Sequence, residues 1–433
     1  MSRPPARAAR YEFLTFRSAP GGRAWLTGLI DKVGTARAVG SSVLDSRWVT
    51  VGFTWYGLRA LGVAEASLAT FPEEFRQGMA ARADVLGVTG ANHPDHWVGG
   101  LASPTLHAIV ILFARDVAER ERCRQEHERY LKQCEGVELL SSLDLEAIPP
   151  FDYAHEHFGY RDRLSQPVIE GTGVEPTPGS GPPIKPGEFF LGYPDEEGPA
   201  GGMPQPDILS RNGSYVAYLM IEEHVGRFRD FLREHGETLE QQEMIAAKLM
   251  GRWRSGAPLV LAGDKDDPNL GADHRRNNDF NYASMDPYGY ACPLGAHIRR
   301  MNPRDTKLTR LTDVNLHRLI RRGTTYGPPY DKNALSEADD QVPHGAYFLF
   351  ISAKAMDTIE FLQQEWINDG NFIGIGSERD PIIGRQEEGA TFTIPRRPVR
   401  RLVHGIETFN VLRGGEYFFM PSISALNWLA NLT

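Results

Sequence analysis

The sequence predicts an α+β fold made of duplicated ferredoxin-like units, each with an antiparallel sheet and peripheral helices. Two short apolar runs, Leu106–Ala114 and Ala346–Ser352, have the length and continuity of buried strands. Each run leads into a charged segment with helical periodicity, Asp116–Gln133 in the first half and Ala355–Ile367 in the second. Because both halves follow one plan despite low sequence identity, we expect a structural duplication.

The remaining elements of the first half fit the same plan. Glu12–Phe16 begins a strand, Gly21–Val33 is a candidate helix, Trp48–Trp55 is β-rich and Tyr56–Gly62 is helical. The resulting order is strand, helix, strand, strand, helix, strand, which is typical of a ferredoxin-like unit. This unit is expected to span residues 1–205, including a long Pro- and Gly-rich loop that begins at Thr172.

The second unit is expected to span residues 206–433. Its predicted elements, besides those already named, are a strand at Ser214–Ile221, helices at Glu222–His235 and Gln241–Trp253, and a strand at Glu416–Met420. Both units can bury a core of ordinary size, since 41% of the 433 residues are hydrophobic and 24% are charged.

Charge and cysteine content favour some classes of protein over others. A net charge of −9 argues against nucleic acid or an anionic membrane as a partner, although Arg396, Arg397, Arg400 and Arg401 form a local basic patch that we interpret as a solvated loop. Three cysteines without a CxxC pair are typical of a reducing compartment. Without an apolar run of membrane-helix length or a signal-peptide core, a soluble cytoplasmic protein is expected.

The segment His157–Pro167 (HFGYRDRLSQP) contains the first candidate catalytic residue. Asp162 lies between Arg161 and Arg163 in an apolar setting. Neighbouring cations favour its ionised form and burial opposes it, so the carboxylate is suited to acid–base chemistry. The alternative is an aspartate that fixes a turn through salt bridges.

Two further segments combine arginines with glycine and proline. Cys292–Arg304 (CPLGAHIRRMNPR) contains His297, a candidate axial ligand of haem iron, followed by arginines able to hold the haem carboxylates. Its alternative is a histidine satisfied by hydrogen bonds. Leu319–Pro328 places Arg321 and Arg322 before a glycine. They could stabilise developing negative charge, or simply end a helix next to a Gly cap.

Taken together, these segments resemble the dye-decolorizing peroxidase superfamily, in its long form without a signal peptide. The order and spacing match from VGFTWYGLRALG through HFGYRDRLSQPVIEGTG, GEFFLGYPDE, CPLGAHIRRMNPR, RRGTTYG and GSERDPIIG to GGEYFFMPSISAL. The resemblance implies one haem b per chain, bound in the C-terminal half. It also implies reduction of hydrogen peroxide through a ferryl intermediate and oxidation of dyes, phenols or other bulky one-electron donors.

The resemblance also implies roles for individual residues. His297 matches the proximal iron ligand, Asp162 the distal aspartate and Arg321 the distal arginine, with Arg322 as its rival. Glu378, Asp380 and Glu416 are candidate carboxylate partners of His297. The residues expected at the haem are His297, Gln166, Ile169, Glu170, Gly171, Thr172, Arg300 and Phe348.

One position departs from the family pattern. Arg163 stands where the family motif has a glycine after the aspartate, so a positive φ there would strain the chain by roughly 1–2 kcal/mol. The departure motivates one alternative, a haem-binding or haem-handling protein with weak turnover. A separate alternative is a ferredoxin-like scaffold without haem that takes another ligand. The expected partners are hydrogen peroxide and small aromatic reductants, with the chain acting as a monomer or homodimer.

Overall fold

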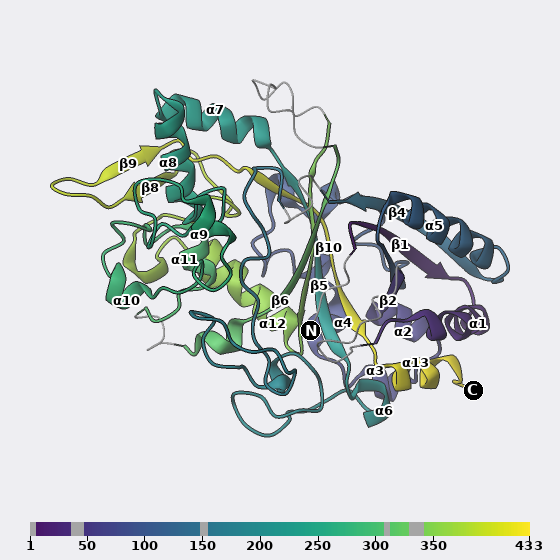
Figure 1. The fold of residues 1–433 in the computed structure, drawn as a ribbon. Coiled ribbons are helices and arrows are strands. Elements are labelled where there is room, and N and C mark those ends of the chain that lie inside the picture. The colour runs from purple at the N-terminus through teal and green to yellow at the C-terminus, as the bar shows by residue number, and fades with distance from the viewer. Residues whose placement is uncertain (1–5, 36–46, 148–154, 307–311, 329–341) are drawn as a thin grey trace.

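An eight-stranded antiparallel sheet organises the fold, with the helices around it (Figure 1). The computed structural model describes residues 6–35, 47–147, 155–306, 312–328 and 342–433. In these ranges, no helix is long and apolar enough to cross a membrane. The predicted α+β class is confirmed.

The strand order of the sheet repeats. Across the sheet lie β4 (Val137–Glu146), β1 (Ala8–Phe16), β3 (Ala108–Ala114), β2 (Arg47–Phe53), β10 (Asn410–Met420), β5 (Ser214–Glu223), β7 (Gly345–Ser352) and β6 (Ile320–Tyr326). Numbered within its own half, each set of four strands has the order 4-1-3-2. The two half-sheets join where Phe419 of β10 pairs with Phe53 of β2. The repeated order supports the duplication, while the boundary between residues 205 and 206 stays a prediction.

Helices follow the strands in both halves, as the sequence predicts. The first half contains α1 (Ala19–Leu29), α2 (Trp55–Ala60), α3 (Glu65–Leu68), α4 (Glu73–Gln77) and α5 (Val117–Leu131). The second contains α6 (Asp207–Ser210), α7 (Val225–His235), α8 (Leu239–Met250), α9 (Pro268–Ala272), α10 (Tyr282–Met285), α11 (His297–Met301), α12 (Ala355–Phe361) and α13 (Ile423–Ala430). A two-stranded ribbon, β8 (Thr391–Ile394) with β9 (Arg401–His404), completes the fold.

Several predicted boundaries are corrected by the structure. The helix expected from Glu222 begins at Val225, because β5 continues to Glu223. The helix expected to run to Ile367 does reach that residue, but it is α-helical only to Phe361 and continues as a π-helix over Leu362–Ile367. The segment with Arg321 and Arg322 is not a helix end but the strand β6.

The two faces of the sheet bury different cores. One face encloses an aromatic cluster that includes Tyr11, Tyr218 and Tyr347. The edge strands meet around this cluster, because Thr325 of β6 donates a hydrogen bond to the carbonyl of Glu146 of β4 at 3.0 Å. The opposite face packs against helices, and its second-half portion provides one wall of a cavity described below.

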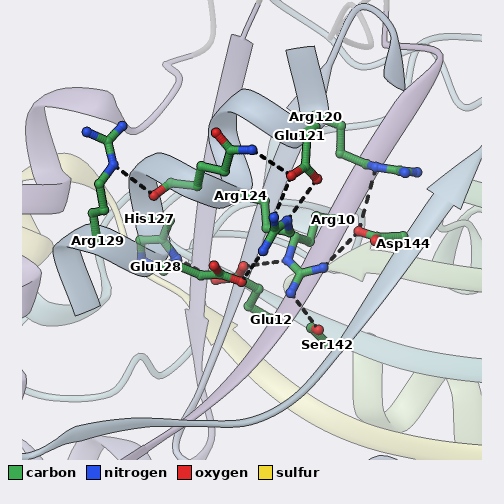
Figure 2. Close-up of polar contacts among 11 residues, drawn as sticks. Arg10, Glu12, Arg120, Glu121, Arg124, His127, Glu128, Arg129, Ser142 and Asp144 are labelled. Atoms are coloured by element: carbon green, nitrogen blue, oxygen red, sulfur yellow. Dashed lines mark hydrogen bonds and ion pairs between the residues drawn. The ribbon is translucent and has the colours of Figure 1, made fainter. Parts of the chain in front are cut away.

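A charged network ties α5 to the first half-sheet (Figure 2). Glu12 of β1, fully buried, accepts hydrogen bonds from Arg10 and from the ring of His127 on α5. The indole N–H of Trp25 reaches the other ring nitrogen of His127 at 3.3 Å, so His127 must carry its proton on Nδ1, toward Glu12. Arg10 also bonds Asp144 of β4 at 3.0 Å, which links α5, β1 and β4. Each buried charge thus has a partner, as burial requires.

Candidate active site

A cavity of about 370 Å³ lies against the second half-sheet and brings together residues from distant segments. Its walls come from β5, β6, β7, α11, α12 and the loop that contains Asp162. Four of the residues singled out in the sequence line it: His297, Asp162, Arg321 and Phe348. The arrangement therefore places a possible metal ligand, a carboxylate and a guanidinium around one cavity.

His297 is the first residue of α11 and is oriented by a buried carboxylate. Its Nδ1 lies 2.9 Å from Oδ2 of Asp380, which is fully buried. The other oxygen of Asp380 accepts hydrogen bonds from the backbone N–H groups of Ile382 and Ile383 at 2.9 and 3.0 Å. Burial alone would raise the pKa of Asp380, but the charge and hydrogen bond of His297, with Arg300, hold that pKa below its ordinary value.

The hydrogen bond between His297 and Asp380 decides which ring nitrogen of the histidine can bind a metal. An ionised Asp380 can only accept, so Nδ1 of His297 is the donor, and in the neutral imidazole the lone pair then lies on Nε2. An imidazole held this way is the usual arrangement of a metal-binding histidine. Of the three carboxylates considered from the sequence, Asp380 makes this contact, whereas Glu416 accepts from the backbone of Met79 and Tyr417.

On another wall, Asp162 lies over β6. A methyl group added to Gly323 would stand 3.0 Å from the ring of Phe348 and 3.5 Å from Oδ2 of Asp162. Phe348 is the register partner of Gly323 on β7. Since Arg321 is two residues from Gly323 on the same strand, its side chain shares the face that Asp162 covers. Asp162 and Arg321 are therefore neighbours in the cavity wall.

The alternation of the strand separates Arg321 from Arg322. Arg321 lines the cavity and donates from Nη2 to the carbonyl of Ser165 at 2.6 Å. Arg322 does not line the cavity, and its Nη1 lies 2.9 Å from the carbonyl of Arg321. Gln166 bonds both the N–H and the carbonyl of Arg321, at 3.0 and 3.2 Å. It thus connects β6 to the loop of Asp162 rather than facing the cavity.

Arginines concentrate around the same space. Arg252, Arg304, Arg318 and Arg321 all line it, and within the described ranges none forms an ion pair with a carboxylate. Burial, with repulsion from Arg321 and Arg304, lowers the pKa of Arg318 to about 10. Burial and repulsion from Arg304 lower the pKa of Arg252 to about 10. Arg252 is buried, Arg304 and Arg318 are partly buried, and Arg321 is exposed. Cations that repel one another around one cavity favour an anionic ligand, so the cavity is suited to a group with carboxylates.

Arg300 takes a different place from the one expected. Its guanidinium is fully buried and donates to the carbonyls of Trp366, at 2.7 Å, and of Gly295 and Glu378. It does not line the cavity, so the predicted contact with a haem carboxylate has no support from the geometry. Arg304 and Arg318, which the sequence interpretation missed, occupy the wall instead; Arg304 was visible as the last residue of the Cys292–Arg304 motif.

The expected haem-edge residues after Gln166 also lie off the cavity. Ile169 packs in a small core with Ile184 and Phe189, and the side chain of Thr172 donates to the carbonyl of Ile169 at 2.7 Å. Glu170 and Gly171 are exposed. These residues shape the loop that follows Asp162, and the structure gives them no contact with the cavity.

Arg163 adopts the strained backbone that its motif position demands. Its φ is +65°, in the left-handed region. We expect Arg163→Gly to raise the free energy of unfolding by about 1 kcal/mol, because glycine occupies this region without a Cβ clash. Urea denaturation of the purified variants measures the change. Arg163→Ala is the matched control, since it removes the side chain and keeps the strain. An equal rise in the free energy of unfolding in both variants would show that the arginine side chain, and not the positive φ, destabilises the folded protein.

Two glutamates share a hydrogen bond in the cavity wall beside Asp162. Glu156 and Glu223 both line the cavity, and one carboxyl must be protonated for them to bond. Burial, with the charge of the partner, raises the pKa of Glu223 well above its ordinary value, and burial raises the pKa of Glu156 to about 7. Backbone N–H groups of Phe158 and Tyr160 donate to Glu156 at 2.8 and 2.6 Å.

This pair predicts a stability that falls as pH rises. Below about pH 4.5 both carboxyls are protonated in the folded and in the unfolded chain. As the pH rises above that value only the folded chain keeps the protons, so raising the pH costs stability. We expect Glu223→Gln to flatten this slope, because an amide can accept from His157 and donate to Glu156 without titrating. Urea denaturation at pH 5 and pH 8 gives the slope. An unchanged slope in the variant would contradict the shared proton.

Comparisons with known proteins find relatives that are peroxidases, a class whose chemistry fits the side chains around the cavity. A dye-decolorizing peroxidase of Mycena epipterygia is 32% identical over 416 residues, which is 88% of this chain and 76% of that protein. Peroxidase 2 of Mycetinis scorodonius is 32% identical over 87% of this chain and 75% of its own length. A crystal structure of a fungal DyP-type peroxidase from Auricularia auricula-judae is 26% identical, with a TM-score of 0.85 over 98% of this chain and 96% of that chain. No protein-family model matches.

Proposed function

Because this chain belongs to the dye-decolorizing peroxidase family and is a peroxidase, we propose that His297 holds a haem b in the cavity while Asp162 and Arg321 act on hydrogen peroxide. The observation that carries the proposal is the cavity itself, which His297, Asp162 and Arg321 line together. These residues lie far apart in the sequence.

The donor set supports haem as the cofactor. Nε2 of His297 is the unprotonated nitrogen of an imidazole fixed by Asp380, as an iron ligand requires. Arg304 and Arg318 are partly buried cations of the cavity wall and are suited to the two carboxylates of the porphyrin. When bound, the haem would supply the two electrons that cleavage of the O–O bond takes, which these side chains cannot provide. Nη1 of Arg318 donates a hydrogen bond to Oδ1 of Asn302 at 3.0 Å, which restricts the guanidinium.

Asp162 and Arg321 have complementary roles on the peroxide. Asp162 accepts the proton of one peroxide oxygen on its carboxylate and returns it to the other oxygen, which leaves as water. Arg321, held by the carbonyl of Ser165, stabilises the negative charge that builds as the O–O bond breaks. Phe348, beside Gly323, restricts the space next to Asp162. Both groups lie on one face of β6, Arg321 on the strand itself and Asp162 on the loop that covers Gly323.

The reductants are proposed from the relatives. One structural neighbour, 26% identical with a TM-score of 0.84, is a dye-decolorizing peroxidase in complex with 2,6-dimethoxyphenol. We propose phenols, dyes and other small aromatic one-electron donors for this chain as well. A cytoplasmic location and a monomeric or homodimeric state stay predictions.

An absorption spectrum of the haem-loaded protein, before and after one equivalent of hydrogen peroxide, tests the proposal. We expect a Soret band that changes within milliseconds to seconds and returns when a phenol is added. A Soret band that peroxide leaves unchanged would favour the haem-binding protein with weak turnover that the Arg163 departure suggests. A protein without a Soret band after expression with adequate haem would contradict haem binding altogether.

A further inference from the structure

Peroxide reduction consumes protons as well as electrons. One hydrogen peroxide, two electrons and two protons give two molecules of water. In the proposed mechanism Asp162 moves a proton between the two peroxide oxygens, so the first water takes both hydrogens of the peroxide. The second oxygen can leave as water only after two electrons, from two one-electron donors, and two protons have reached the cavity. Asp162, which must be ionised to accept a proton, and Arg321, which keeps its proton, are not the source of these two protons.

Two carboxyl groups that this mechanism does not use lie in the same cavity wall. Glu156 belongs to the loop of Asp162, and Glu223 is the last residue of β5; both line the cavity. Burial is the main cause of their raised pKa values, and the charge of Asp162 adds to both. The three carboxyls are therefore close enough to act on one another. Glu223 is only 5% exposed, so its proton is sheltered from bulk solvent.

The hydrogen bonds of the two glutamates determine which of them carries the shared proton. Both oxygens of Glu156 accept backbone N–H groups, Oε2 from Phe158 at 2.8 Å and Oε1 from Tyr160 at 2.6 Å. Glu223 accepts the N–H of His157 on Oε2 at 3.1 Å. Two carboxylates cannot bond each other without a proton, and Glu156 is already an acceptor on both oxygens, so Glu223 carries the proton. The pKa values have the same order, because burial raises that of Glu156 to about 7 and that of Glu223 well above its ordinary value.

The other titratable groups around this pair are poor proton donors at neutral pH. Burial lowers the pKa of His157 to about 4, and its Nε2 is bonded to a backbone carbonyl at 2.8 Å, so the ring is neutral and its proton is engaged. His344 stacks on His157 with ring centres 5.1 Å apart. Arg254 donates to Glu243 at 2.7 Å and remains a cation. Among these described neighbours, Glu223 is the group with a proton that it can release.

We propose that Glu223, hydrogen-bonded to Glu156, supplies the protons for the second water and passes them to the cavity through Asp162. In each transfer Glu223 loses a proton, Asp162 gains it and gives it to the remaining oxygen, and Glu223 takes up another proton from the solvent. Two transfers accompany the two electrons, so charge and atoms balance. Glu223 acts through Asp162 and does not itself contact peroxide. The inference rests on the proposed function, because it adds a proton source to the site that reacts with peroxide.

Sequential stopped-flow mixing of the haem-loaded protein at about pH 8 tests the proposal. The protein reacts with one equivalent of peroxide and is then mixed with ferrocyanide, an electron donor that brings no proton. Glu223→Gln is expected to slow the second reaction by at least about 10-fold, while the first changes by less than about 3-fold because peroxide brings its own proton. At this pH Glu156 is ionised in both proteins, so the substitution removes the stored proton and leaves the charge of the pair unchanged.

Glu416→Gln is the matched control. Glu416 is also a buried glutamate whose pKa burial raises to about 7, but it does not line the cavity, so both rates should stay within about 3-fold of the parent. A second readout does not depend on turnover. The infrared C=O band of protonated carboxyl groups, recorded for the resting haem-loaded protein at the same pH, should lose intensity in Glu223→Gln and keep it in Glu416→Gln.

An unchanged rate of reduction in Glu223→Gln, or an equal slowing in Glu416→Gln, would overturn the proposal. An infrared band that Glu223→Gln leaves unchanged would do the same, because Glu223 would then hold no proton. Equal slowing of the peroxide reaction and of the reduction would also contradict it, since the substitution would then act on the packing of the wall. Failure of the proposed function is distinguishable: a parent protein that does not react with peroxide contradicts that function, whereas a normal parent and a Glu223→Gln variant reduced at the parent rate contradict the proton supply alone.

Discussion

Asp162→Asn is expected to slow the reaction of the haem-loaded protein with hydrogen peroxide by about 100- to 10 000-fold. The amide keeps the size of the side chain over Gly323 but cannot take the peroxide proton. Arg321→Leu should lose about 100- to 1000-fold, because it removes the positive charge that stabilises the breaking O–O bond. Stopped-flow absorbance at several peroxide concentrations gives the second-order rate constant for each variant.

The neighbouring arginine provides a control for this experiment. Arg322 is on the same strand and has the same charge, but it does not line the cavity. Arg322→Leu should therefore leave the rate constant within about 3-fold of the parent, because the side chain of Arg322 leaves β6 on the face opposite to that of Arg321. If the rate constant fell further in Arg322→Leu than in Arg321→Leu, Arg322 and not Arg321 would be the arginine that acts on peroxide. A full rate in Asp162→Asn would show that another group moves the proton, and Glu156, in the same cavity wall, would be the candidate.

The choice between these two arginines illustrates what the sequence determines and what it leaves open. The motif placed both residues near the reaction, but only the secondary structure decides which side chain faces inward. A glycine after two basic residues is compatible with a helix end as well as with a strand. In the structure, Gly323 pairs with Phe348, and the parity of β6 then selects Arg321.

Contacts between distant segments were harder to predict than motifs. Asp380 is 83 residues from His297, and nothing in its own segment distinguishes it from Glu378 as a hydrogen-bond partner. Arg300 was expected at the haem because it lies three residues after His297. Its guanidinium instead bonds backbone carbonyls. Arg304 reaches the cavity because the chain turns there, with φ of +53°. Such turns depend on tertiary packing, which composition and periodicity do not record.

The duplication, in contrast, was predictable from local patterns alone. Leu106–Ala114 and Ala346–Ser352 correspond closely to β3 and β7, which hold equivalent places in the two half-sheets. Continuous apolar runs followed by charged helices are encoded within about 25 residues, so no distant contact is needed to find them. The half-sheets nevertheless form one continuous sheet through β2 and β10. That junction depends on long-range pairing and could not be inferred from either half.

His297→Ala is expected to weaken haem binding by more than about 100-fold. Loss of a partner that orients a metal-bound histidine usually costs 10- to 100-fold in affinity, so loss of the ligand itself should cost more. Titration of the haem-free protein with haem, followed by the Soret band, gives the dissociation constant. Asp380→Asn should fall in the 10- to 100-fold range and should also raise the reduction potential of the iron, because a neutral amide makes the imidazole a weaker donor.

Glu378→Gln separates this effect from a general loss of charge near α11. Glu378 is a buried carboxylate two residues from Asp380, but its side chain makes no hydrogen bond to His297 in the structure. Its replacement should leave both the dissociation constant and the reduction potential near the parent values. Haem affinity retained in His297→Ala would remove the ligand assignment. A reduction potential that moves in Glu378→Gln and not in Asp380→Asn would transfer the orienting role to Glu378. Affinity and potential together therefore test the histidine and its partner independently of any turnover.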